Sequence, residues 1–290
     1  METVINNKHI FYDQIGNGSL DIVMLHGWGQ NMEMMRPLAL KMINDKNNKN
    51  LYRITIVDLP GFGASSEPDM NTDIFGYTKL LEDFLASLSI KNPVMIGHSF
   101  GGRISIVYAS RNETRKVILF GAPCIREYKP NFKEKVLKTL KKIPFTKDLV
   151  ELAKQYIGST DYKNATPVMR TVLVNTINQD LSECAKKITA PTLLIWGTLD
   201  TAAPLELAKK LESILKDGAL IELPGATHYA YLERIDYVTN VLINFIGYHN
   251  ALKPVLYSVE AILNNDYFHY KDFAVTYVKI FLTLQSYYKK

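Results

Sequence analysis

Three residues whose types cooperate in nucleophilic catalysis each follow an apolar run of this chain, and the first of them is a serine. Ser99 lies in the Gly-His-Ser-Phe-Gly run of residues 97–101, which follows the apolar run 94–96 and precedes a stretch, 102–109, with the spacing of a buried helix. This context predicts a strand, a sharp turn and a helix. Such a turn strains the serine backbone, exposes the hydroxyl and leaves the N–H of Phe100 at a helix N-terminus. Ser99 is therefore a candidate nucleophile, and Phe100 is a candidate donor to an oxyanion.

An acid and a base follow in an order that this chemistry can use. Asp200 comes after the apolar run 190–197, and His228 comes after the run 220–223. Because the carboxyl ends of parallel strands meet at one edge of a sheet, we expect both side chains beside Ser99. His228 would take the serine proton and return it to the leaving group, while Asp200 would orient the imidazole ring.

Each of these polar residues also has an alternative interpretation. His228 could be a loop histidine with a structural role, and Asp200 could cap the helix that is expected to begin near Pro204. Glu127 is the substitute acid if Asp200 is dispensable. Arg103, on the helix after the turn, is either a structural arginine or a clamp for a substrate carboxylate.

Two further loops complete a pattern. His-Gly-Trp-Gly occupies positions 26–29 after the apolar run 21–25, and Asp-Leu-Pro-Gly-Phe-Gly-Ala-Ser occupies positions 58–65 after the run 51–57. The glycine spacing of the second loop fits neither a P-loop nor a dinucleotide fingerprint. Together with the Gly-x-Ser-x-Gly turn and the order nucleophile, acid, base, the loops resemble the α/β-hydrolase superfamily over residues 3–247.

The resemblance implies roles for residues of both loops. In this superfamily the residue after His-Gly supplies the second oxyanion N–H, a role that falls here to Trp28 beside Phe100. His26 would brace the loop by hydrogen bonding, with proton transfer in catalysis as the alternative. Asp58 is expected to be a turn residue rather than a catalytic one. The candidate residues of the substrate pocket are Trp28, His98, Met169 and Tyr229.

The expected fold class is α/β: an α/β-hydrolase fold with a mostly parallel sheet, an antiparallel N-terminal edge and helices on both faces. The edge is expected from two strand-like runs between residues 3 and 15, separated by Asn-Asn-Lys. After the strand 115–120 the alternation of strands and helices stops, so we expect an inserted helical lid. Helices are also predicted at 32–43, 77–88, 205–215 and 232–246. The predicted division is a core at 1–121, the lid at 122–189, the rest of the core at 190–248 and a C-terminal helical extension at 249–290.

The resemblance implies hydrolysis without a metal or an organic cofactor. A serine nucleophile excludes haloalkane dehalogenases and epoxide hydrolases, which need a carboxylate at the place of Ser99. The branch of small capped enzymes includes carboxylesterases and C–C hydrolases of meta-cleavage products. We expect cleavage of a small to medium carboxylic ester, or of a related acyl bond, through an acyl-enzyme on Ser99. The alternatives are C–C cleavage of a diketo acid and a ligand-binding receptor with slow turnover.

Composition limits the classes of protein to which this chain can belong. The chain has 290 residues, of which 47% are hydrophobic, which is enough for one large α/β domain with an insertion or for two small domains, and its net charge is +5. Two widely separated cysteines, no recognisable secretory leader and no apolar run of about 18 residues predict a cytoplasmic protein that does not span a membrane. Lysines crowd residues 129–147, either as a solvated helix face or to steer anionic substrates. They belong to no known nucleic-acid-binding motif, which argues against nucleic-acid binding.

The C-terminal extension contains the apolar stretch 273–282, which is too short to span a bilayer and includes Lys279. The apolar surface of such a helix must be buried against another surface. The candidates are the core of the same chain, a membrane surface and a second copy of the chain in a homodimer. The expected partners are therefore a small-molecule substrate and, through this extension, a second copy.

Overall fold

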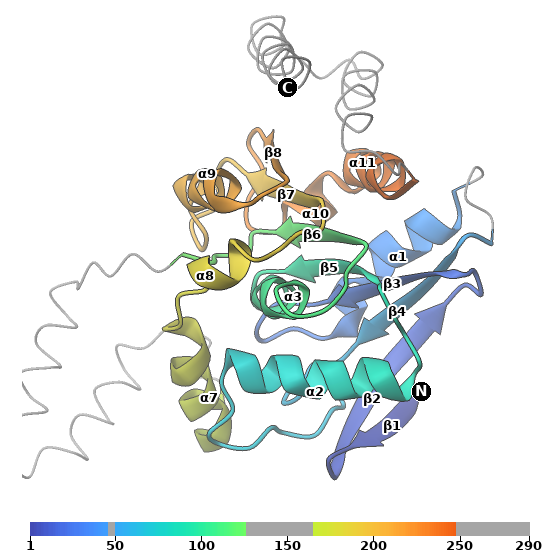
Figure 1. The fold of residues 1–290 in the computed structure, drawn as a ribbon, viewed down its shortest axis with the longest axis vertical. Coiled ribbons are helices and arrows are strands. Elements are labelled where there is room, and N and C mark those ends of the chain that lie inside the picture. Colours follow the sequence, from blue (N-terminus) through green and yellow to red (C-terminus); the bar gives the residue numbers. More distant parts are fainter. Residues whose placement is uncertain (46–49, 126–164, 248–290) are drawn as a thin grey trace, which may run out of the picture.

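One eight-stranded sheet organises the molecule, with the strand order β1-β2-β4-β3-β5-β6-β7-β8. It is seen in a computed structural model that describes residues 1–45, 50–125 and 165–247 (Figure 1). The strands are β1 (Glu2–Ile5), β2 (Lys8–Ile15), β3 (Leu20–Leu25), β4 (Tyr52–Val57), β5 (Val94–His98), β6 (Lys116–Phe120), β7 (Thr192–Gly197) and β8 (Gly218–Leu223).

The N-terminal edge of the sheet is antiparallel and the rest is parallel. Asn6 and Asn7 join β1 to β2 with φ angles of 49° and 60°, the left-handed conformations that a tight two-residue hairpin turn requires. β2 pairs antiparallel with β4, and every pairing from β4 to β8 is parallel. Every residue of β5, β6 and β7 is buried, as is typical of parallel strands covered on both faces. The expected fold class is confirmed.

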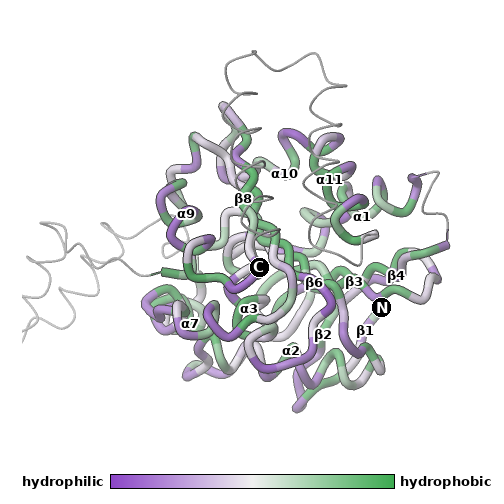
Figure 2. The backbone as a smooth tube through the Cα atoms, turned by 45° about the horizontal axis from the view of Figure 1, so that its top comes forward, coloured by the Kyte–Doolittle hydropathy of each residue, from purple (hydrophilic) through white to green (hydrophobic). Residues whose placement is uncertain are grey.

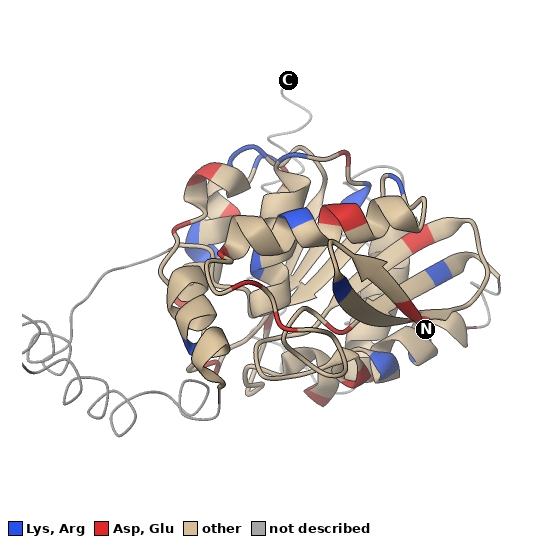
Figure 3. Ribbon diagram, turned by 90° about the horizontal axis from the view of Figure 1, so that it is seen from below, with Lys and Arg blue, Asp and Glu red and all other residues tan. Residues whose placement is uncertain are grey.

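Helices cover both faces of this sheet. Residues of α2 (Ile74–Ser87), α3 (Phe100–Ala109), α8 (Ser182–Ala185) and α9 (Leu205–Ile214) belong to one apolar cluster, and those of α1 (Arg36–Ile43), α10 (Ala230–Glu233) and α11 (Ile235–Gly247) belong to another. In Figure 2 the central strands are coloured as hydrophobic, whereas Figure 3 shows charged residues on the outer helices and loops.

Three of the expected helices differ from the prediction at their ends. Residues 32–43 divide into a 3₁₀ turn, Met32–Met34, and α1, which has a proline in its first turn. Residues 232–246 divide at Arg234, whose φ of −124° and ψ of 40° interrupt the helix between α10 and α11. The helix expected from residue 77 begins earlier because Asp73 caps it, accepting the N–H of Gly76 at 2.8 Å. A proline, an interrupting residue and a cap therefore set these three boundaries, which hydrophobic periodicity alone does not locate.

Of the expected lid, the structure describes residues 122–125 and 165–189, which include α7 (Pro167–Ile177) and α8. Arg103 ties it to the core, because its guanidinium donates to the carbonyl oxygens of Thr176 at 3.0 Å and Gln179 at 2.6 Å, as well as to Pro123 at 2.5 Å. The structural interpretation of Arg103 is thereby confirmed. Glu127, the lysine-rich stretch and the extension 249–290 lie outside the described residues, and the division into core, lid and extension stays a prediction.

Two further findings concern the described residues. Cys124 and Cys184 are both free thiols, and burial raises the pKa of the Cys124 thiol to about 12. None of the described helices has the length and apolarity needed to cross a membrane.

Candidate active site

The turn between β5 and α3 has the strained geometry expected for the Gly-x-Ser-x-Gly sequence. Ser99 has φ 49° and ψ −110°, and its N–H donates to the carbonyl oxygen of Phe120 at 2.8 Å. A Cβ atom at Gly97 would lie 2.5 Å from the Cα of Gly102, and one at Gly101 would lie 2.4 Å from the carbonyl oxygen of Leu25. The turn is therefore as tight as backbone contact allows, and it holds Ser99 in a conformation that costs about 1–3 kcal/mol.

The His-Gly-Trp-Gly loop after β3 is bound to the start of α3. The N–H of Gly101 donates to the carbonyl oxygen of His26 at 3.1 Å, and the rings of Trp28 and Phe100 meet edge to face with centroids 5.1 Å apart. Phe100 is the first residue of α3, so its N–H has no acceptor within the helix. The backbone of Trp28 is thus held next to this helix N-terminus.

His26 braces the loop, as the sequence predicts. Its Nδ1 donates to the carbonyl oxygen of Gly27 at 2.7 Å, and its Nε2 accepts the N–H of Leu59 at 3.0 Å. Burial lowers the pKa of His26 to about 4, and a neutral ring satisfies both contacts. Asp58 is likewise a turn residue: its carboxylate accepts the N–H of Met32 at 2.8 Å and that of Ala64 at 2.9 Å.

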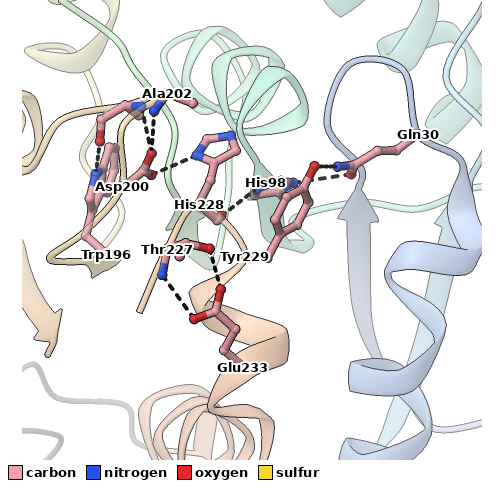
Figure 4. Close-up of polar contacts among 10 residues, drawn as sticks. Gln30, His98, Trp196, Asp200, Ala202, Thr227, His228, Tyr229 and Glu233 are labelled. Atoms are coloured by element: carbon pink, nitrogen blue, oxygen red, sulfur yellow. Dashed lines mark hydrogen bonds and ion pairs between the residues drawn. The ribbon is translucent and has the colours of Figure 1, made fainter. Parts of the chain in front are cut away.

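Asp200 and His228 form a buried pair (Figure 4). Nδ1 of His228 lies 2.7 Å from Oδ2 of Asp200, whose side chain is 1% exposed. The other carboxylate oxygen accepts the N–H groups of Ala202 at 2.9 Å and Ala203 at 2.8 Å. Asp200 therefore holds a turn with one oxygen and the imidazole with the other, whereas the N-cap of α9 is Pro204.

A tryptophan supports this turn. The indole N–H of Trp196, in β7, donates to the carbonyl oxygen of Ala203 at 2.6 Å, and Trp196 itself is fully buried. The loop of the histidine is held in a comparable way, because the carboxylate of Glu233 accepts the N–H of Thr227 at 3.0 Å and also the hydroxyl of Thr227. Side chains from α10 and β7 thus fix both loops.

Two contacts place His228 beside the serine turn. His98, the residue before Ser99, has its ring 4.7 Å from the ring of His228. Gly121 follows Phe120, to which Ser99 is bonded, and a Cβ atom there would lie 2.9 Å from Nδ1 of His228. With Nδ1 bound to Asp200, the other ring nitrogen of His228 is the one that can accept a proton. Figure 4 shows this nitrogen pointing away from Asp200.

The candidate pocket residues have different surroundings. Trp28 is partly buried with its ring against Phe62, and Tyr229 is 40% exposed. Met169 is 4% exposed and packs against Gly61. His98 is 0% exposed and faces Tyr231 of α10, with ring centroids 5.0 Å apart. The expectation that His98 lines the pocket is corrected: as the last residue of β5, it points to the sheet face that α10 covers and lies beneath His228.

Four residues at the site were not predicted from the sequence: Gln30, Gly121, Trp196 and Glu233. Gly121 directly follows a strand and has φ 51°, so a glycine in this position was a usable signal. Trp196 and Glu233 contact partners seven and six positions away, and Gln30 contacts Tyr229, 199 positions away; neither hydrophobic periodicity nor a turn sequence indicates these contacts.

A strained serine turn between a buried parallel strand and a helix, with an acid–base pair on later loops of the same sheet, defines the class of α/β hydrolases. The sequence profile of the family described as "alpha/beta hydrolase fold" matches residues 22–152. The chain has the α/β-hydrolase fold, and the family match and the similar proteins support its membership of that superfamily.

Similar proteins cover nearly the whole fold. An AB hydrolase superfamily protein of Bacillus subtilis, YisY, is 28% identical over 81% of this chain and 94% of its own length. A pimeloyl-[acyl-carrier protein] methyl ester esterase of Wigglesworthia glossinidia brevipalpis is 26% identical over 84% of this chain and all of its own. The solved structure of an esterase from Exiguobacterium antarcticum superposes with a TM-score of 0.65 at 22% identity, covering 84% of this chain and 98% of the esterase. The last likeness concerns the fold alone.

Proposed function

We propose that the protein is a serine hydrolase that cleaves a small to medium carboxylic ester, or a related acyl bond, through an acyl-enzyme on Ser99. The observation that carries this proposal is the 2.7 Å contact between Asp200 and His228 next to the strained turn of Ser99. A carboxylate on one ring nitrogen fixes the imidazole tautomer in which the other nitrogen accepts a proton, and that tautomer makes a serine hydroxyl nucleophilic.

The mechanism follows from these positions. His228 takes the proton of Ser99 as the serine oxygen attacks the ester carbonyl, and the N–H groups of Phe100 and Trp28 donate to the resulting oxyanion. The intermediate collapses when the C–O bond breaks and His228 returns the proton to the leaving alcohol. A water molecule, deprotonated by His228, then attacks the acyl-enzyme, and the carboxylic acid is released as Ser99 regains its proton. Asp200 stays ionised throughout and stabilises the imidazolium.

The aromatic wall next to Ser99 favours an apolar acyl group. Trp28 lies edge to face against Phe62 at 4.9 Å and against Phe100 at 5.1 Å, so the partly buried indole presents apolar surface beside the helix that begins after Ser99. Burial of apolar surface stabilises a bound acyl chain by about 25 cal/mol per Å². We therefore expect acyl chains longer than acetate to be better substrates.

A second candidate function is hydrolysis of the methyl ester of an acyl group carried on an acyl-carrier protein. It is favoured by the relative from Wigglesworthia, whose name states this activity. The test compares a dicarboxylic acid monomethyl ester as the free acid and as the thioester of a carrier protein. A lower KM for the carrier-bound ester supports the second function, whereas equal KM values support a general esterase.

The main proposal is tested with p-nitrophenyl esters from acetate upward. Ser99→Ala is expected to lower kcat at least ~10⁴-fold, because the nucleophile is lost. Ser110→Ala is the matched control, since this hydroxyl donates only to the carbonyl oxygen of Val107 at the end of α3, and it should retain activity. Equally feeble hydrolysis by wild type and Ser99→Ala would overturn the proposal and favour C–C hydrolysis or a ligand-binding receptor.

A further inference from the structure

One side chain, Gln30, contacts both loops that carry the proposed chemistry (Figure 4). Its amide oxygen accepts the backbone N–H of Gly27 at 3.1 Å, and its amide nitrogen donates to the phenolic oxygen of Tyr229 at 3.0 Å. Gly27 directly precedes Trp28, and Tyr229 directly follows His228. Gln30 thus bridges the oxyanion loop and the loop of the base through residues adjacent to their functional groups.

His98 lies beside this bridge and holds the backbone of His228. Its Nε2 lies 3.0 Å from the carbonyl oxygen of His228, and because a carbonyl only accepts, this nitrogen carries the ring proton. Its unprotonated Nδ1 faces the amide oxygen of Gln30 at 3.3 Å, and because both atoms are acceptors this contact is not a hydrogen bond. Burial lowers the pKa of His98 to about 3, so the ring stays neutral in ordinary assays. The imidazole of His98 is fully buried, and its centroid lies 4.7 Å from the ring centroid of His228 and 5.4 Å from that of Tyr229.

We propose that Gln30 is a positioning residue that couples the oxyanion loop to the loop of His228. The inference rests on the proposed function, in which Trp28 and His228 act in the same transition state. Oxyanion donors and a general base are effective only in a fixed mutual geometry, and a misplacement of about 1 Å can cost about 100-fold in rate. Gln30 makes a hydrogen bond to each of the two loops, and it is only half-buried, so its loss should affect geometry more than core stability.

The first test is Gln30→Leu, which keeps the approximate size of the side chain and removes both hydrogen bonds. Loss of the fixed geometry should lower kcat for the best p-nitrophenyl ester about tenfold while KM changes less than about twofold. The matched control is Gln14→Leu, because Gln14 donates to the hydroxyl of Thr55 at 3.2 Å between β2 and β4. This control should change kcat less than about twofold. An unchanged kcat in Gln30→Leu, or an equal loss in Gln14→Leu, overturns the proposal.

A double-mutant cycle with Tyr229→Phe tests the bridge itself. Tyr229→Phe removes the phenolic oxygen and leaves the ring, and it should lower kcat about threefold. The double variant should be no slower than Gln30→Leu within about twofold, because both changes break the same link. Multiplicative losses, or losses that appear in KM alone, would mean that the two side chains contact substrate separately, and the coupling would be refuted.

Labelling of Ser99 with a fluorophosphonate separates this proposal from the proposed function. The reagent needs an activated serine and an oxyanion site, but no particular substrate. If wild type hydrolyses no ester yet is labelled, the proposed function fails, and about tenfold slower labelling of Gln30→Leu still supports the positioning role. Equal labelling rates overturn the positioning role alone. A wild type that is neither active nor labelled overturns both.

Discussion

The two halves of the candidate site are held by different forces. In the half that carries Ser99, backbone lies directly against backbone: the glycines at 97 and 101 leave no room for a Cβ atom, and Ser99 is strained. In the half that carries His228, polar side chains hold the loops, with Trp196 and Glu233 as the fixed partners. Close backbone contact fixes the first half, whereas hydrogen bonds of side chains fix the second. The first half should therefore fail by unfolding, and the second by losing activity while it remains folded.

The largest effect is expected from Asp200→Asn, which attacks the second half. Asn can still accept the N–H groups of Ala202 and Ala203 through its oxygen, but its NH₂ group then faces Nδ1 of His228 and forces the wrong tautomer. The corresponding substitution in the serine-protease triad, a worked example for this chemistry, lowers kcat about 10⁴-fold, and we expect ~10³–10⁴-fold here with a small change in urea midpoint.

Asp58→Asn is the comparison variant for this prediction. Each oxygen of Asp58 accepts a different backbone N–H, from Met32 and from Ala64, so an amide leaves one donor facing another donor. We expect a loss of about 1–3 kcal/mol in the free energy of unfolding, with little loss of kcat per folded molecule. If Asp200→Asn instead lost stability and kept its activity, the contrast between the two halves would be wrong.

Gly97→Ala should have the next largest effect, and it acts on the first half. The added methyl would lie 2.5 Å from the Cα of Gly102 and 2.6 Å from its N, so backbone must move. We expect a loss of about 3 kcal/mol in the free energy of unfolding, measured with urea. Gly225→Ala separates space from backbone strain, because Gly225 has φ 72° but no atom within 4 Å of an added Cβ. That variant should lose about 1 kcal/mol, and equal losses at both positions would contradict steric exclusion as the cause.

Acid should weaken the site by smaller amounts, because it contains two neutral buried histidines. The pKa of His26 is lowered to about 4 and that of His98 to about 3, from an unfolded value near 6.5. The unfolded chain therefore binds more protons below pH 6.5, and stability present above that pH is lost as the pH falls toward 3–4. Between pH 7 and pH 5 the loss is on the order of 2 kcal/mol for each histidine.

The measurement is the free energy of unfolding in urea at pH 7 and at pH 5. His26→Asn and His98→Asn should each reduce the difference between the two values relative to wild type, since one titrating ring is removed. His98→Asn should also lower kcat, because His98 holds the carbonyl oxygen of His228. A difference that neither variant changes would show that other groups govern the acid sensitivity.

The sequence by itself determined the features whose causes are local. The antiparallel edge was predictable from Asn6 and Asn7, because few residues tolerate left-handed backbone. The turn at Ser99 was predictable from its flanking glycines, and the buried strands β5–β7 were predictable from unbroken apolar runs. The sequence also predicted that Ser99, Asp200 and His228 lie close together, because each follows a strand whose carboxyl end lies at the same edge of the sheet.

Only the tertiary structure decided how the loops at that edge are held. Gln30 meets Tyr229 across nearly 200 positions, and Arg103 meets the end of α7 in the same non-local way. His98 was predicted to line the pocket but lies buried under His228. The physical reason is that a hydrogen bond between distant residues depends on packing distances of the finished fold, to within a few tenths of an ångström. Periodicity and turn chemistry encode no such distances, so the sequence indicated the candidate reacting groups and the fold supplied the contacts that hold their loops.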